Sequence, residues 1–498
     1  MRLGRLYLKR FKRFTGMLLA LMLLLTIFSG NTFAADTQDN NSAQYLQEVR
    51  NFINLKYNGV IDEEALNKAT SVKDMFELLD DYSVFLTQKD YEALTASLGG
   101  SVEGVGVGVD YEGKYVIVLK VFDNSPAKKA GVLKGDKIAQ VNGVSVAGKS
   151  MEDVTSMVKG LAGTTVKVGF IRQGVKNIIT LEMERAVVDI PSVHYEIRND
   201  IGYIHIDTFS SNAYSGVTKA LEYFDSKKIT KVVLDLRNNP GGYADQAAKI
   251  ARYFVPKGLI TTLDYKDEAD PDTFYYSDLE KTKYKLAVLV NENSASASEI
   301  LTGAIKDTNA GIIIGNKTFG KAKVQSSFPI LSNEAYDIFN QDSEIKSVNA
   351  LDFPYALIDD LLGWAKMTIG LYYTPNGTCI DLKGIEPDVK VVEPKAEDYI
   401  PVNMVEPLSV VVKPSLGTQY TDVFYAECVL KLLQYNVDKP DNTLDKKTFE
   451  AIKKFQKDNK VYSYGVLDFC TQKLLSEKLA SLKVSKDTAY AKAVQLLK

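Results

Sequence analysis

The chain has 498 residues, of which 45% are hydrophobic and 25% are charged, and its formal net charge is −3. This length exceeds that of a single ordinary domain, and the composition is typical of a globular protein. The first 34 residues carry six basic side chains and no acidic one, so the rest of the chain is acidic, which argues against nucleic acid as a partner. Two histidines and three widely spaced cysteines argue against a metal site or a disulfide framework, and no cofactor is expected.

Residues 1–34 have the layout of an export signal. The basic segment "RLGRLYLKRFKR" is followed by the apolar run "MLLALMLLLTIF" and then by "SGNTFAAD". This order is typical of a secretory signal peptide, with cleavage after Ala34. If the segment is not cleaved, it serves as a membrane anchor instead. In both cases we expect the remainder of the chain outside the cytoplasm, either secreted or in a bacterial cell envelope.

Residues 36–98 are predicted to form an N-terminal helical region. The stretches "SAQYLQEVRNFINLKY" and "KDMFELLDDYSVFL" repeat apolar residues at a spacing of three to four, which indicates amphipathic helices. Such helices either pack on their own chain or form the arm of a homodimer, and the pattern allows both.

Residues 99–186 form the next predicted domain, which is rich in glycine and β-strand formers. The stretch "GGSVEGVGVGVDYEGKYVIVLKVF" predicts a glycine loop ahead of a strand, and such a loop frees backbone N–H groups to bind a carboxylate. The following "SPAKKAGVLKGDKIAQVNGVSV" resembles the core signature of a PDZ domain. The resemblance implies that a protein C-terminus binds at the loop residues Gly104, Val105, Gly106, Val107 and Gly108.

Residues 187–393 alternate between strands and helices. The apolar runs in "KVVLDLRNNPGG", "KLAVLV" and "AGIIIGN" predict buried strands of a sheet covered by helices. Functional groups of such sheets gather beyond the carboxyl ends of the strands. The loops "NNPGG", "ENSAS" and "KTFGKAKVQ" all follow predicted strands, so we expect them to share one rim.

The stretch "NENSASASEI" at residues 291–300 has two interpretations. Ser296 followed by Glu299 fits a helix capping box, and a serine at a strand-to-helix turn also fits a nucleophile. Of the two histidines, His205 lies in an alternating strand, which argues against a Ser-His relay. A desolvated lysine is the other possible base, and Lys321 and Lys323 both qualify because spacing alone does not separate them.

Five motifs occur in the order found in the C-terminal processing (tail-specific) serine proteases, within a resemblance that spans residues 42–392. They are "LRNNPGG", "SASASEI", "KTFGKAKVQ", "YYTPNG" and "KGIEPDV". The resemblance implies a ClpP/crotonase-like core with a Ser-Lys dyad. It assigns Ser296 as nucleophile, Lys321 as general base and Gln325 as the residue that orients the lysine. It also implies oxyanion donors at the backbone N–H groups of Ala297 and of Gly241 or Gly242.

The expected function is that of an exported serine endopeptidase that binds protein C-termini through its PDZ domain and cleaves through an acyl-enzyme. In some relatives an arginine near the end of the PDZ domain signals that a peptide is bound. Arg172, in "GFIRQG", is the candidate here, and an ordinary surface arginine is the alternative. The rival function is a non-catalytic PDZ-containing envelope adaptor. Acyl-CoA chemistry on a crotonase-like fold would not explain an export signal or a peptide-binding module.

The chain departs from the family pattern in three places. Residues 332–363 form an insertion that could be a lid, a partner surface or a segment without a role. Thr378 and Cys379 stand where relatives usually carry Arg-Ser, and Ala322 replaces a usual glycine.

Beyond the protease core, residues 394–417 are predicted to be a proline-rich linker and 418–485 a helical domain. The stretch "TFEAIKKFQKDNKV" resembles the peptidoglycan-binding three-helix repeat, and a packing or dimerisation module is the alternative. The predicted fold is thus multidomain α/β and α+β, with a protease core, a PDZ-like domain and helices at both ends.

Overall fold

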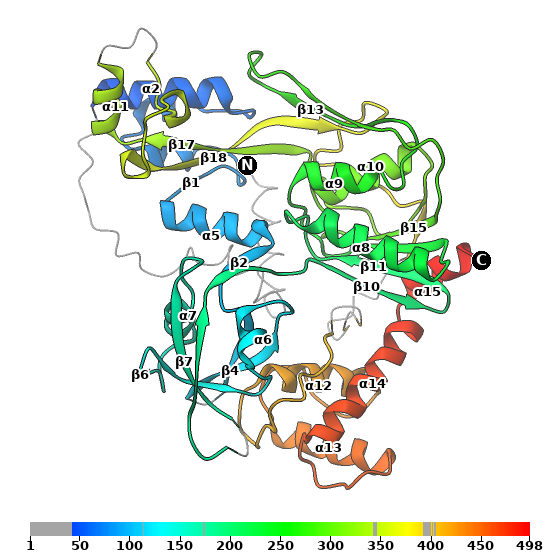
Figure 1. Ribbon diagram of the computed structural model, residues 1–498. Helices are drawn as coiled ribbons and strands as arrows, with labels where there is room; N and C mark the ends of the chain where they lie inside the picture. Colours follow the sequence, from blue (N-terminus) through cyan, green and yellow to red (C-terminus); the bar gives the residue numbers. More distant parts are fainter. Residues whose placement is uncertain are drawn as a thin grey trace. The chain divides into compact units, whose positions relative to one another are not determined.

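The computed structural model describes residues 42–498 except 113, 173–174, 342–345, 392–399, 401 and 403–404. The predicted signal segment and part of the predicted linker therefore lie outside the described residues. The chain divides into two compact units (Figure 1). One consists of residues before Ala96 together with Gln325–Ile369, and the other of Ala96–Val324 together with Gly370–Lys498. Among the helices that are described, none has the length and apolar character needed to cross a membrane.

The first unit is built on the N-terminal helices. It contains α2 (Ala43–Lys56), α3 (Glu63–Lys68), α4 (Val72–Phe76), β1 (Val84–Leu86), most of α5 (Gln88–Gly99) and of β17 (Lys323–Leu331), α11 (Asn333–Asn340), the 3-10 turns Ala350–Asp352 and Ile358–Asp360, and the start of β18 (Leu361–Tyr373). β1 pairs antiparallel with Trp364–Lys366 of β18.

Helix α2 packs on its own chain within this unit. The Tyr45 hydroxyl donates to the Leu331 carbonyl at 2.7 Å, and its ring meets Tyr336 of α11 edge to face at 5.6 Å between centroids. Phe52 makes a similar contact with Phe328. The start of the predicted insertion is thus part of the core around α2. A homodimer arm remains a prediction.

The PDZ segment is an antiparallel sheet with short helices. Its elements are β2 (Ser101–Gly104), β3 (Val107–Glu112), β4 (Tyr115–Val121), α6 (Pro126–Ala130), β5 (Lys137–Val141), β6 (Val144–Ser145), α7 (Met151–Val158), β7 (Thr165–Ile171), β8 (Ile179–Glu184) and β9 (Ala186–Asp189). The main strand order is β3-β4-β5-β7-β8, so β3, directly after the glycine loop, is an edge strand. Gly106 has φ +78°, and a Cβ there would lie 2.3 Å from the Ser125 Cβ, so the loop requires glycine at this position.

The predicted protease segment contains a six-stranded sheet of order β10-β11-β12-β15-β16-β19. The strands are β10 (Val193–Arg198), β11 (Ile201–Ile206), β12 (Lys231–Asp235), β15 (Lys285–Val290), β16 (Ile312–Gly315) and β19 (Val389–Lys390). β10 runs antiparallel to β11, and the other neighbours are parallel. The predicted strands are confirmed, and the multidomain α/β fold is as expected.

Both faces of this sheet are covered. Helices α8 (Ala213–Ser226), α9 (Ala244–Ala251) and α10 (Ala297–Asp307) share an apolar cluster with Ile204, Val232 and Val288. Helix α15 (Thr488–Leu496) packs with the alternate residues of the same strands, among them Tyr203, Val233 and Leu289 (Figure 1). Successive side chains of a strand point to opposite faces, so strands covered on both faces are apolar throughout. This explains the continuous runs "VVL" and "LAVLV".

The remaining elements of the second unit lie beside this core and after it. β13 (Gly258–Tyr265) pairs with β14 (Thr273–Ser277) and with Gly370–Tyr373 of β18. Helices α12 (Thr421–Leu432), α13 (Lys446–Asp458) and α14 (Phe469–Ser485) share one apolar core that includes Val429, Ile452 and Leu475. These three helices fall within the predicted segment 418–485, and peptidoglycan binding by it stays a prediction.

Candidate active site

Ser296 lies at the turn between β15 and α10 in a strained backbone conformation. Its φ is 55° and its ψ is −116°, a region that residues with a side chain rarely occupy. Half of the predicted capping box is present, because the Ser296 N–H donates to Glu299 Oε2 at 3.0 Å. The Ser296 hydroxyl makes no capping hydrogen bond, and the Glu299 N–H instead donates to the Ser296 carbonyl at 2.7 Å. The hydroxyl is therefore not committed to ending the helix, and the sharp turn resembles that of a nucleophilic serine.

The neighbouring serines have structural roles. The Ser294 hydroxyl donates to the Leu236 carbonyl at 2.8 Å, and the Ser298 hydroxyl donates to the Asn239 carbonyl at 3.0 Å. Both serines are fully buried, whereas Ser296 is half-buried. The three alternating serines thus separate into two that hold the "LRNNPGG" turn and Ser296, whose hydroxyl does not bond to that turn.

Glu299 joins the serine turn to the lysine loop. Besides the Ser296 N–H, its fully buried carboxylate accepts the Lys321 N–H at 2.9 Å and the Gly320 N–H at 2.7 Å. The Thr318 hydroxyl donates to it at 2.6 Å. Burial raises the pKa of the Glu299 carboxyl above its ordinary value, and these hydrogen bonds oppose the rise. We take the carboxylate to be ionised because each of the four groups hydrogen-bonded to it is a donor. The sequence indicated only its capping role.

Tyr372 connects the same two segments from β18. Its hydroxyl lies 3.1 Å from the Ser296 carbonyl oxygen and 2.8 Å from that of Lys321, so its one proton is shared between two backbone acceptors. Its backbone N–H donates to the Ala322 carbonyl at 2.9 Å. Burial raises the pKa of Tyr372 well above its ordinary value, which keeps the hydroxyl a donor. The sequence analysis assigned no role to this residue, although it begins the motif "YYTPNG".

The two candidate lysines have different surroundings. Lys323 Nζ lies 3.9 Å from Asp381 Oδ2, and each side chain is less than a fifth exposed, at 19% and 18%. The other oxygen of Asp381 accepts the Ala322 N–H at 3.1 Å, which fixes the loop between the lysines. Lys321 is half-buried, and its backbone is held by Glu299.

The "PGG" turn lies against the serine. Gly241 has φ +108°, and a Cβ there would lie 2.8 Å from the Ser296 Cβ and 3.1 Å from the Ala297 nitrogen. The Gly241 N–H donates to Asn239 Oδ1 at 2.9 Å. Within the part of the chain that the structure describes, no hydrogen bond engages the N–H of Ala297 or of Gly242. These are two of the three N–H groups that the sequence analysis predicted as oxyanion donors.

Asn239 supports this turn, a role that the sequence analysis did not assign. Its fully buried side chain accepts the Gly241 N–H and donates to the Ile206 carbonyl at 2.8 Å. Its own carbonyl accepts the Ala295 N–H at 3.0 Å. The "PGG" turn and the serine turn are therefore bonded through one residue.

Other predicted residues lie elsewhere. Gln325 belongs to the first unit, where its side chain donates to the Tyr82 carbonyl at 2.6 Å, and its role in orienting Lys321 stays a prediction. His194 and His205 share one carboxylate, with Nε2 atoms 2.8 and 3.0 Å from the two oxygens of Asp207. The two histidines, on β10 and β11, are thus paired with an acid directly after β11 and not with a serine.

In the PDZ segment, Gly104 ends β2, and Val107 and Gly108 begin the edge strand β3. Arg172 forms a bidentate pair with the buried Asp136, with both distances 2.7 Å, and donates to the Gly131 carbonyl at 2.9 Å. The structure thus gives Arg172 partners inside its own domain, and a signalling role remains a prediction.

Comparison with known proteins agrees with this geometry. The model of peptidase family S41 matches residues 200–391, and the PDZ domain model matches residues 104–183. Carboxy-terminal processing protease CtpA of Bacillus subtilis is 30% identical over 431 residues, which cover 86% of this chain and 84% of that protein. The chain belongs to the carboxy-terminal processing proteases. This membership favours the enzyme over the non-catalytic adaptor.

Two further proteins are similar to this protease. Carboxy-terminal processing protease CtpB of Bacillus subtilis is 29% identical over 456 residues, which cover 91% of this chain and 88% of that protein. A solved structure of the photosystem II D1 C-terminal processing protease is 28% identical, with a TM-score of 0.40, and the match covers 70% of this chain and 92% of that chain.

Replacing Glu299 by glutamine is expected to lower kcat/KM about 100-fold, because small misplacements of reacting groups have effects of this size. The substitution puts an NH2 group among four donors, so the Ser296 and Lys321 turns lose their common acceptor. Turnover of casein per folded molecule, with folding checked by circular dichroism, measures the effect. The matched control is Glu292→Gln, an exposed residue of the same loop. Equal turnover of both variants and the wild type would contradict the role of Glu299.

Proposed function

We propose that this protease cleaves peptide bonds with Ser296 as nucleophile and Lys321 as general base. The observation that carries the proposal is the Glu299 carboxylate, which accepts the backbone N–H groups of both residues at 3.0 and 2.9 Å. A serine hydroxyl needs a neighbouring base at neutral pH. A lysine amine serves as that base when its surroundings favour the neutral form.

In the first half of the reaction, the neutral amine of Lys321 takes the proton of the Ser296 hydroxyl while Oγ attacks the peptide carbonyl carbon. The resulting ammonium returns that proton to the leaving amine nitrogen as the C–N bond breaks. In the second half, water attacks the acyl-enzyme, with Lys321 again taking and returning one proton. The products are a new C-terminal carboxylate and the regenerated serine.

The negative charge on the tetrahedral oxygen is stabilised by backbone donors. The Ala297 N–H lies in the first turn of α10, where the helix dipole adds partial positive charge. We assign the second donor to Gly242, because the Gly241 N–H is already bonded to Asn239. One such donor contributes about 3 kcal/mol to lowering the barrier.

Ser296→Ala and Lys321→Ala are each expected to lower kcat by roughly 10⁴-fold or more, since nucleophile and base act as a unit. The double variant should be no worse than either single variant. The measurement is cleavage of casein by the purified full chain. Lys323→Ala, which removes the lysine paired with Asp381, is the matched control and should retain most activity.

The pH dependence of the same reaction separates the two lysines. A lysine base predicts that kcat/KM rises with pH as the amine loses its proton. That limb should be kept in Lys323→Ala. If Ser296→Ala cleaves casein as fast as the wild type, the assignment of the nucleophile is wrong.

We also propose that the PDZ segment selects substrates by their C-terminal carboxylate. The supporting features are the glycine loop at Gly104–Gly108 and the edge position of β3, which leaves one side of that strand open to an added peptide strand. Loop N–H groups bind a carboxylate, and the edge binds the preceding residues in extended form.

A peptide with a free C-terminal carboxylate is therefore expected to bind at least about 10-fold more tightly than the same peptide ending in an amide, because a charge-assisted hydrogen bond is lost. Fluorescence anisotropy with the full-length Ser296→Ala variant measures both affinities without cleavage. Equal dissociation constants would contradict carboxylate recognition.

We further propose that the protease is exported through residues 1–34. The support is the order of a basic segment, an apolar run and "SGNTFAAD" in the sequence. Expression in a bacterial host followed by N-terminal sequencing is expected to give a mature chain that starts at Ala35. A chain that keeps Met1 and stays in the cytoplasmic fraction would contradict export, and an uncleaved chain in the membrane fraction would identify an anchor.

A further inference from the structure

The segment that follows β11 holds the "PGG" turn by hydrogen bonds to the backbone of that turn. The Phe209 N–H and the Thr208 hydroxyl both donate to the Gly241 carbonyl, each at 2.8 Å. The Phe209 carbonyl accepts the Tyr243 N–H at 2.8 Å, so that Phe209 and Gly242 form an isolated parallel bridge. Of these three hydrogen bonds, the one from Thr208 is made by a side chain.

The same bonds set the direction of the proposed oxyanion donor. Gly241 and Gly242 are joined by a trans peptide bond, whose carbonyl and N–H point in opposite directions within one plane. Because the Gly241 carbonyl is directed at Thr208 and Phe209, the Gly242 N–H is directed away from them. In the part of the chain that the structure describes, that N–H has no hydrogen-bond partner. The peptide plane that carries the donor is therefore fixed from its carbonyl side.

The two glycines lie tightly between this segment and the proposed nucleophile. A Cβ at Gly242 would lie 2.5 Å from the Phe209 carbonyl oxygen, and a Cβ at Gly241 would lie 2.8 Å from the Ser296 Cβ. A donor to an oxyanion is effective only at hydrogen-bond distance from the place where the negative charge develops. Rotation of the Gly241–Gly242 peptide would move the N–H relative to Ser296 and weaken this contact.

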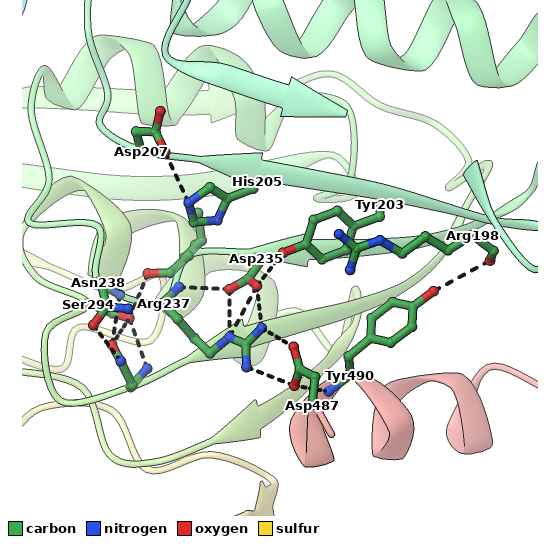
Figure 2. Close-up of polar contacts among 12 residues, drawn as sticks. Arg198, Tyr203, His205, Asp207, Asp235, Arg237, Asn238, Ser294, Asp487 and Tyr490 are labelled. Carbon is green, nitrogen blue, oxygen red and sulfur yellow. Dashed lines mark hydrogen bonds and ion pairs between the residues drawn. The ribbon is translucent and has the colours of Figure 1, made fainter. Parts of the chain in front are cut away.

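Thr208 is itself held on both sides along the chain. The preceding Asp207 has its two oxygens 2.8 and 3.0 Å from Nε2 of His194 and of His205, and Figure 2 shows the contact with His205. Burial raises the pKa of the Asp207 carboxyl, but the hydrogen bonds from both histidines outweigh burial and hold that pKa below its ordinary value. The following Phe209 is fully buried in the apolar cluster that α8, α9 and α10 share with the sheet. The Thr208 hydroxyl therefore reaches the turn from a backbone that is fixed before and after it.

We propose that Thr208 is a positioning residue for proteolysis, whose hydroxyl orients the Gly241–Gly242 peptide so that the Gly242 N–H donates to the oxyanion. Without the hydroxyl, the Gly241 carbonyl keeps the Phe209 N–H as a donor. The turn then stays attached to β11, but its peptide plane is free to rotate about that one bond. This inference rests on the proposed function of Ser296 and on Gly242 as an oxyanion donor.

The test uses the full-length chain with Thr208→Val, which keeps the shape of the side chain and removes the hydroxyl. We expect kcat to fall about 10-fold with KM changed less than about 3-fold, because an oxyanion donor acts in the transition state and loss of a whole donor lowers kcat about 100-fold or more. A peptide boronic acid, which forms a tetrahedral adduct with serine, should bind more weakly by a similar factor. Thr208→Ser, which keeps the hydroxyl, should recover most of kcat.

Thr308→Val is the matched control. It removes a threonine hydroxyl that also donates to a backbone carbonyl, that of Ala304 at 2.6 Å, at the end of α10 that is opposite to Ser296. Its kcat, its KM and its affinity for the boronic acid should be those of the wild type.

Rates are taken per folded molecule, at a temperature well below the melting transition of each variant. A purely structural role of Thr208 would lower the melting temperature of Thr208→Val and leave kcat and the boronic acid affinity unchanged, and that result would overturn the proposal. A Thr208→Ser variant as slow as Thr208→Val would also overturn it, because the hydroxyl would then not be the group that matters. If Thr208→Val does not fold, Thr208→Ala removes the same hydroxyl and is judged by the same two results.

The Ser296→Ala variant separates this inference from the proposed function. Loss of cleavage in Ser296→Ala together with wild-type kcat in Thr208→Val rejects only the role of Thr208. Full activity of Ser296→Ala rejects the proposed function and this inference with it.

Discussion

The buried carboxylate of Glu299 is the contact on which the proposed active site depends. It accepts backbone N–H groups from Ser296, Gly320 and Lys321 and a hydroxyl from Thr318. A buried acid is tolerated only when its oxygens have donors, and these donors come from two loops that follow neighbouring parallel strands. Neither loop can move away without leaving an acceptor unfilled. The relative position of the two proposed catalytic residues is therefore set at their backbones.

This arrangement also accounts for the strained serine. A residue such as Ser296 with φ of 55° and ψ of −116° costs about 1–3 kcal/mol and persists only when its neighbours determine its conformation. Glu299 holds its N–H, the Tyr372 hydroxyl lies 3.1 Å from its carbonyl oxygen, and Asn239 accepts the N–H of the preceding Ala295. The backbone is thus held on both sides while the hydroxyl is left out of the network. A strained backbone conformation therefore falls on the residue that is proposed to react.

The sequence was sufficient for the family and the fold class, because the relevant signals are local. Apolar runs located the buried strands, and motif order placed three loops at the carboxyl ends of β12, β15 and β16. The choice between Lys321 and Lys323 could not be made from spacing. The structure adds that Asp381, which is 58 residues beyond Lys323 in the chain, lies close to that lysine in the folded state.

The supporting residues were missed for the same physical reason. Asn239 and Tyr372 make hydrogen bonds to backbone groups of other segments. Because every residue has a backbone carbonyl, the residue type at the acceptor position does not reveal such a bond. Only the motif letters around Asn239 and Tyr372 hinted at a role.

The place of α15 changes how the chain is divided. A parallel sheet needs apolar cover on both faces, and the helices α8, α9 and α10 all share one apolar cluster with it. Residues of α15 supply cover for the alternate side chains of the same strands, including Tyr203, Val233 and Leu289. The predicted protease segment 187–393 therefore lacks one layer of its own core. In chain order, helices α12 to α14 stand between β19, the last strand of the sheet, and α15, which covers one face of that sheet. The helical segment is therefore an insertion within the chain that builds this core, and not a separate domain added after it.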